Sequence, residues 1–160
     1  MNFDTRYLYI ILGLIVIMNL FSGSFDILGV LLTLPGVLVA ITFHEYAHAL
    51  AAYKLGDDTP KVQGRLNLNP LTHLDPIAVV LLVFTHIGWG KPVEINPNNF
   101  DRKISARAGE AIVAAAGPIM NILLAFVIAI IFYALQVFAT GFAIGTQTGM
   151  IIMTMLQYAV

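Results

Sequence analysis

The residues with the clearest chemical potential are His44, Glu45 and His48, in the segment His-Glu-Tyr-Ala-His. On a helix, residues four positions apart project from one face, so the two imidazoles can bind one metal ion. Glu45 reaches the open coordination position, where a carboxylate can take a proton from metal-bound water. A zinc ion lowers the pKa of its bound water to about 7. The pattern therefore predicts a zinc site with Glu45 as general base and peptide-bond hydrolysis as the reaction.

Two other residues are candidate ligands by type, because the chain has no cysteine and any metal site must use His and carboxylate. They are His73 and Asp75. For Asp75 we favour a helix cap, since Asp followed by Pro76 is a typical start of a helix. For His73 we favour hydrogen bonding that orients its loop, with direct zinc ligation as the alternative.

The composition is typical of a membrane protein. Hydrophobic residues make up 59% of the chain and charged residues only 11%, whereas soluble domains carry about 25% charged residues. The net charge of -1 provides no basic surface of the kind that nucleic acid requires. We therefore expect an integral membrane protein in contact with lipid, and no nucleic-acid partner.

Long charge-free runs predict the membrane spans. The runs 7–25 and 27–43 can each cross a bilayer as a helix, and the second is expected to continue to about Leu55. The stretch 111–160 contains no charge and is long enough for one span and the beginning of another. Because its last run, 149–160, is too short to cross, we expect that the chain is truncated at its C-terminus. The predicted fold class is an all-α polytopic membrane protein, a transmembrane helix bundle forming one domain over 1–160.

The polar region between these spans predicts two further features. The stretches 65–69 and 91–96 alternate polar and apolar residues, which predicts a small β-hairpin at the membrane surface. An unpaired edge of such a sheet could hold a substrate as an added strand, although an ordinary surface hairpin explains the pattern equally well. The apolar stretch 76–89 would cover only about 21 Å as a helix, short of the roughly 30 Å hydrocarbon core. We therefore expect a short re-entrant segment.

The distribution of Lys and Arg predicts the orientation. Basic residues flank 76–89 on both sides, whereas the loops 22–26 and 140–147 contain none. Positive charges mark cytoplasmic loops. We expect a protein of the cell (inner) membrane whose active site faces the cytoplasm.

Four segments stand out in order along the chain: HEYAH at 44–48, LNPLTHLDP at 68–76, GWGKPV at 88–93 and AAAGPIMN at 114–121. Together they resemble the site-2 protease family of intramembrane zinc metallopeptidases. The resemblance extends from roughly residue 27 to residue 130 and is closest to small bacterial and archaeal members that lack a PDZ domain.

The resemblance implies a function and a ligand set. It implies zinc held by His44, His48 and an Asp from a later Asn-x-x-Pro-x-x-x-Leu-Asp-Gly motif, which this sequence does not contain. The Leu74-Asp75 pair lies in a different family segment, so the third ligand is expected beyond Val160. The implied activity is hydrolysis of transmembrane or membrane-proximal protein or peptide substrates. The alternative is a related membrane protein that binds metal or helices without cleaving them.

Overall fold

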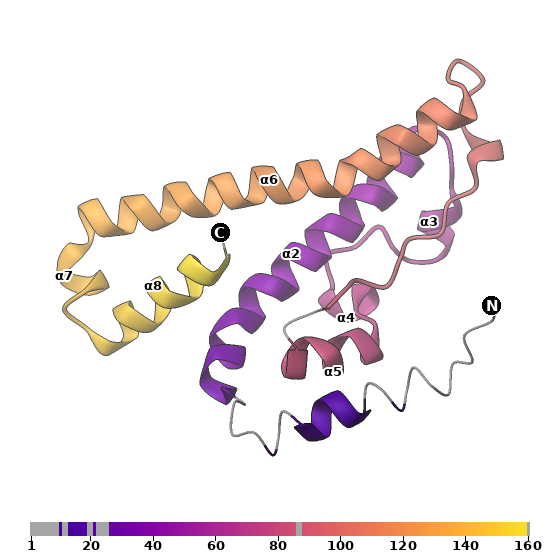
Figure 1. The fold of residues 1–160 in the computed structure, drawn as a ribbon. Coiled ribbons are helices and arrows are strands. Elements are labelled where there is room, and N and C mark those ends of the chain that lie inside the picture. Colours follow the sequence, from indigo (N-terminus) through magenta and orange to yellow (C-terminus); the bar gives the residue numbers. More distant parts are fainter. Residues whose placement is uncertain (1–9, 11–12, 19–20, 22–25, 86–87, 160) are drawn as a thin grey trace.

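Two long helices that pack against each other dominate the computed structural model (Figure 1). The structure describes residues 10, 13–18, 21, 26–85 and 88–159, and these are mostly helical. The long helices are α2 (Ile27–Lys54) and α6 (Ala106–Phe138), and α8 (Gln147–Ala159) lies against both. The shorter elements are α3 (Thr59–Val62), α4 (Pro70–His73), α5 (Pro76–Thr85), the 3-10 turn η1 (Pro97–Asn99) and α7 (Thr140–Ala143). The predicted all-α class is confirmed for this part of the chain.

Capping residues fix where the two long helices begin. The Asp26 carboxylate accepts a hydrogen bond from the backbone N–H of Gly29 at 2.9 Å, and the Ser105 hydroxyl accepts one from Ala108 at 3.3 Å. Each bond satisfies a backbone donor that the first helical turn leaves free. At the other end of α2, Gly56 adopts a φ of 103°, which turns the chain out of the helix.

Both long helices are long and apolar enough to cross a membrane. With 28 and 33 residues they extend about 42 and 50 Å at 1.5 Å per residue, more than the roughly 30 Å of a hydrocarbon core. Large side chains on α6, among them Ile122 and Phe126, are more than half exposed. Such faces suit contact with lipid. The expected first span, 7–25, falls largely outside the described residues.

The predicted β-hairpin is wrong: among the described residues there is no strand, and the β pairing is an isolated bridge between Leu74 and Gly90. The stretch 65–69 folds back on itself, because the Asn67 side chain accepts a hydrogen bond from the Asn69 N–H at 2.7 Å. The stretch 91–96 is extended, but its terminal N–H groups donate elsewhere, to the His73 carbonyl and to Asp57. These local partners replace the cross-strand bonds of a hairpin.

The expected re-entrant segment is not supported either. α5 has only 10 residues, about 15 Å at 1.5 Å per residue. Two of its side chains, Ala78 and Leu81, are buried within the protein. The described part of this segment is therefore a short helix with two buried side chains, well below the length of a membrane span.

A buried carboxylate joins the two polar loops. Asp57 is fully buried and accepts hydrogen bonds from the Thr59 hydroxyl at 2.5 Å, the Asn96 N–H at 2.7 Å and the Asn99 side chain at 2.9 Å. Burial by itself raises the pKa of Asp57, but these hydrogen bonds outweigh it and hold the pKa below its ordinary value. Asp57 thereby fixes the end of the 91–96 stretch to the region just after α2.

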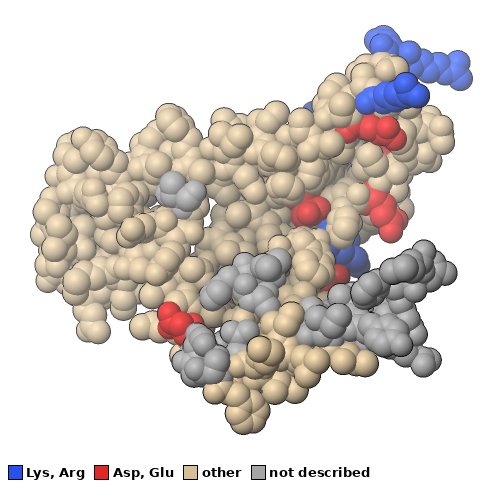
Figure 2. Space-filling view, viewed as in Figure 1, with Lys and Arg blue, Asp and Glu red and all other residues tan. Residues whose placement is uncertain are grey.

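Charged residues gather at the end of the molecule where α6 begins (Figure 2). Beneath them, Phe100 packs with Ala52 of α2 and Val113 of α6 in a small hydrophobic core. A Cβ at Gly109 would lie 2.4 Å from the Phe100 ring, so glycine allows α6 to approach this closely. Phe100 therefore sets the spacing of the two long helices near the candidate site.

Candidate metal and catalytic centre

The two imidazoles of the His-Glu-Tyr-Ala-His segment converge on one point beside α6. His44 and His48 lie on α2, with ring centroids 4.7 Å apart. A Cβ built on Gly117 would lie 2.4 Å from His48 Nε2 and 2.6 Å from His44 Nε2. Both Nε2 atoms thus face the same small space, which exists because residue 117 has no side chain.

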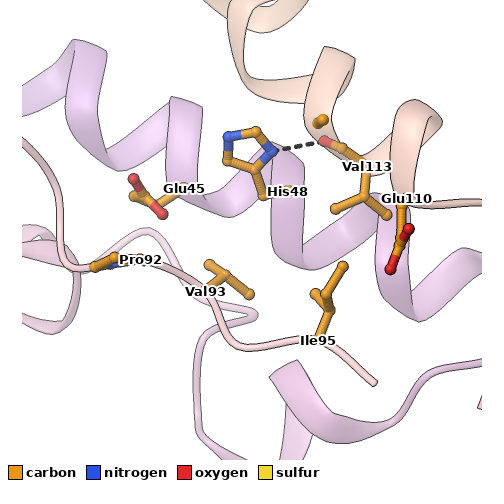
Figure 3. A pocket seen from close by; sticks show the side chains of 8 residues that line it. Glu45, His48, Pro92, Val93, Ile95, Glu110 and Val113 are labelled. Atoms are coloured by element: carbon orange, nitrogen blue, oxygen red, sulfur yellow. Dashed lines mark hydrogen bonds between the residues drawn. The ribbon is translucent and has the colours of Figure 1, made fainter. Parts of the chain in front are cut away.

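The other ring nitrogen of each histidine faces a partner on α6. His48 Nδ1 lies 2.6 Å from the Val113 carbonyl oxygen, so Nδ1–H donates and Nε2 keeps its lone pair (Figure 3). His44 Nδ1 lies 3.1 Å from the amide nitrogen of Asn121, whose Oδ1 is buried without a partner. Turning this amide by 180° lets Oδ1 accept from Nδ1–H. In that arrangement both Nε2 atoms present lone pairs, as metal-ligating histidines do.

Glu45 lies between the α2 backbone and the extended stretch after α5. It is buried, and a Cβ on Gly90 would come within 2.5 Å of Glu45 Oε1, so any side chain at position 90 would displace the carboxylate. The backbone N–H of Val93 lies within interaction range of the carboxylate. The second oxygen, Oε2, has no hydrogen-bond partner. The carboxylate is thus held by backbone on one side and has one oxygen available for chemistry.

Two cavities meet at Glu45. The first, of about 240 Å³, is drawn in Figure 3. It is lined by Glu45, His48, Pro92, Val93, Ile95, Glu110, Val113 and Ala114. The second, of about 450 Å³, is lined by Val37, Ala40, Ile41, His44, Glu45, Leu82, Gly88, Trp89, Gly90 and Asn121. A peptide could therefore lie on either side of the carboxylate.

The two other candidate ligands have structural roles. Asp75 accepts hydrogen bonds from the N–H groups of Ile77 and Ala78 at 2.8 and 3.1 Å, which confirms the predicted cap of α5. His73 is fully buried, and its Nε2 lies 2.8 Å from the Asn67 carbonyl oxygen, as expected for a residue that orients its loop. Within the described ranges, no group of three or more His, Cys, Asp or Glu side chains forms a metal site. The alternative of zinc ligation by His73 is therefore not supported.

Gly117 and Asn121 enter the sequence analysis only within the AAAGPIMN segment, and the structure places both in direct contact with the histidines. Their spacing of four residues places both on the face of α6 that packs against α2. The available signal was this spacing in an otherwise apolar helix. The Val113 carbonyl and Gly90 carry no side-chain signal, so only the structure reveals them.

The chain is similar to two curated bacterial proteins. "Putative zinc metalloprotease YwhC" of Bacillus subtilis (strain 168) is 45% identical over 91 residues, which cover 57% of this chain and 40% of that protein. "Putative zinc metalloprotease Rip2" of Mycolicibacterium smegmatis is 32% identical over 101 residues, which cover 59% of this chain and 37% of that protein. The chain thus spans about 40% of the length of these relatives. No protein-family model and no solved structure matches it significantly. Both relatives are named as zinc metalloproteases, in agreement with the resemblance to zinc metallopeptidases found in the sequence.

Proposed function

We propose that this chain carries the HExxH half of an intramembrane zinc metalloprotease that hydrolyses peptide bonds in transmembrane or membrane-proximal segments. One observation carries the proposal. Two histidine Nε2 atoms face one point beside Gly117, next to a buried carboxylate that has one unpartnered oxygen. The names of the two relatives support the same reaction class.

The donor set fits zinc. His44 and His48 would hold the ion through Nε2, because their Nδ1 atoms face Asn121 and the Val113 carbonyl. When bound, zinc supplies a Lewis acid that polarises a carbonyl group and acidifies water. Catalytic zinc sites ordinarily have three protein ligands. We place the third outside the described residues.

The role of Glu45 follows from its surroundings. Gly90 and Val93 fix one side of the carboxylate, so Oε2 is the oxygen that can accept a proton from water attacking a peptide carbonyl. The same atom can return that proton to the leaving amine. A non-catalytic metal-binding or helix-binding protein would have no need of an unpartnered carboxylate oxygen here, because leaving one buried costs about 1–3 kcal/mol.

The surroundings also support a membrane substrate. Most residues that line the cavity of about 450 Å³ are apolar, and it includes residues of the apolar helices α2 and α5. Side chains of a transmembrane segment fit such walls. The site belongs to an integral protein of the cell membrane, and we place its open end toward the cytoplasm.

The test is Glu45→Gln in the detergent-purified complete protein, which includes the third zinc ligand that we place outside the described residues. We expect zinc content to stay at the wild-type level, because both imidazoles remain, and cleavage of a transmembrane reporter substrate to fall at least 100-fold. Metal analysis and a cleavage assay on the same sample measure both. His48→Ala is the matched control, since it should lose zinc and cleavage together. Undiminished cleavage by Glu45→Gln would remove Glu45 from the reaction.

A further inference from the structure

The smaller cavity beside His48 is sized for one side chain. Its volume of about 240 Å³ lies below the roughly 300–1,000 Å³ of typical small-molecule sites. Its walls are mostly apolar, formed by Val93 and Ile95 on the extended stretch and by Val113 on α6. Figure 3 shows these side chains on two sides of the space, with Glu45 and His48 along a third.

The charged residues that line this cavity are both acidic. Glu45 lies at one end, and Glu110, on the second turn of α6, lies at the other (Figure 3). Glu110 is exposed. Among the described residues the ion pair joins Lys103 to Asp101, so no basic side chain of this part of the chain lies within 4.0 Å of the Glu110 carboxylate. No Lys or Arg lines the cavity.

The nearest basic residues along the chain lie outside the cavity. Arg107 is one turn before Glu110 on α6, and Arg102 and Lys103 precede the helix. All three side chains are exposed, so water and salt screen their effect on the cavity. Apart from the catalytic Glu45, the Glu110 carboxylate is therefore the charge closest to a group bound inside the cavity.

We propose that this cavity is a specificity pocket for a Lys or Arg side chain of the substrate, next to the cleaved bond. This inference rests on the proposed protease function. The apolar walls would cover the methylene stem, as such stems commonly lie along apolar surface, and the Glu110 carboxylate would meet the cationic head. Basic residues are abundant where transmembrane segments meet the cytoplasm, so suitable substrates carry one at this boundary.

The decisive experiment compares peptide substrates that differ at one position near the cleavage site. Lys, Met and Glu are placed there in turn, because Met has a similar unbranched stem without charge. Wild-type protein should cleave the Lys substrate with a kcat/KM roughly 5-fold above that of the Met substrate, as an exposed charge pair would give. Glu110→Gln should bring the kcat/KM values of the Lys and Met substrates together, and the ratio of the two values is the readout. Glu110→Lys should reverse it in favour of the Glu substrate.

Two controls separate the pocket from general charge effects. Glu94→Gln removes an exposed carboxylate that pairs with Gln63 outside this cavity, and it should keep the preference for Lys. Arg107→Gln should strengthen the preference slightly, by removing a repulsive charge. Equal cleavage of Lys and Met substrates by wild type, or an equal loss on both in Glu110→Gln, overturns the pocket.

A binding measurement keeps this proposal distinct from the proteolytic one. The Glu45→Gln protein is titrated with fluorescent Lys and Met peptides, so affinity is read without turnover. A Lys preference that Glu110→Gln removes supports the pocket even if no peptide is cleaved, whereas cleavage of all substrates without any charge preference supports the protease alone.

Discussion

Two of the buried side-chain atoms without a hydrogen-bond partner belong to residues that line the candidate site. In the part of the chain that the structure describes, the side-chain atoms in this condition are Glu45 Oε2, His73 Nδ1 and Asn121 Oδ1. Glu45 and Asn121 line one cavity, whereas His73 is next in the chain to Leu74, which forms a β-bridge with Gly90. Turning the Asn121 amide gives its Oδ1 the His44 Nδ1–H as a partner, whereas each atom that stays without a partner costs about 1–3 kcal/mol of stability. Such atoms are retained where a ligand, substrate or water completes them.

At the same scale, the two nitrogens of His73 can be tested separately. Gln at position 73 can place its amide near the Nε2 position and keep the bond to the Asn67 carbonyl, whereas Asn can keep a polar atom near Nδ1 but cannot reach Asn67. We expect His73→Asn to lower the free energy of unfolding by about 1–3 kcal/mol and His73→Gln to lower it less. Thermal or denaturant unfolding in detergent measures both. A more stable Asn variant would show that Nδ1 makes the more important contact.

The absence of a side chain at Gly117 leads to a second prediction at this scale. In Gly117→Ala the new methyl group would lie 2.4 Å from His48 Nε2 and would force the imidazoles apart. We expect zinc affinity to fall at least 10-fold, in the range found when groups that orient ligands are altered. Competition with a chelator measures the affinity. Gly141→Ala is the matched control, because nothing lies within 4 Å of a Cβ there, and an equal loss in both variants would contradict the proposed site.

At the scale of elements, the helical features were predictable and the polar connections were not. The i, i+4 spacing of His44 and His48 requires only helical periodicity, which α2 provides over its whole length. The hairpin prediction failed because period-2 alternation does not report competing hydrogen-bond partners. In the structure, Asn67 binds its own loop and Asp57 binds the end of the 91–96 stretch. The contact of Asn121 with His44 depends on the packing of α2 against α6, which no local pattern encodes.

The contribution of Asp57 to the free energy of unfolding is expected to depend on pH, because Asp57 joins the loop after α2 to the stretch before α6. Its folded-state pKa is lowered, so its contribution to stability is fully present above the unfolded value of about 3.9 and is lost as pH falls through the folded value. We expect Asp57→Asn to lower the free energy of unfolding by about 1–3 kcal/mol at pH 7. The difference from wild type should shrink below about pH 4. Melting curves at several pH values measure it, and a difference that stays constant down to pH 2 would contradict the assignment.

At the scale of the whole molecule, the two polar loops must lie on one side of the membrane. Asp57 bonds directly to Asn96 and Asn99, so the loop after α2 and the stretch before α6 cannot be separated by a bilayer. From the basic residues of both regions we predict that this side is the cytoplasmic one. Single cysteines at positions 60 and 98 of this cysteine-free chain should therefore be labelled from the same, cytoplasmic side. Labelling from opposite sides would be incompatible with the Asp57 contacts.

The position of the histidines along α2 also determines how deep they lie below the membrane surface. Lys54 lies in the last turn of α2, where its charge stays near water, and His48 precedes it by roughly 9 Å at 1.5 Å per residue. In a bilayer, the position of His44 and His48 along α2 therefore fixes how far below the membrane surface the two imidazoles lie. For the proposed protease, this depth predicts that the bond cut in a substrate depends on its distance from the membrane boundary. We expect a thicker or thinner bilayer to change the tilt of α2 and of the substrate, and thereby the peptide bond that reaches Glu45.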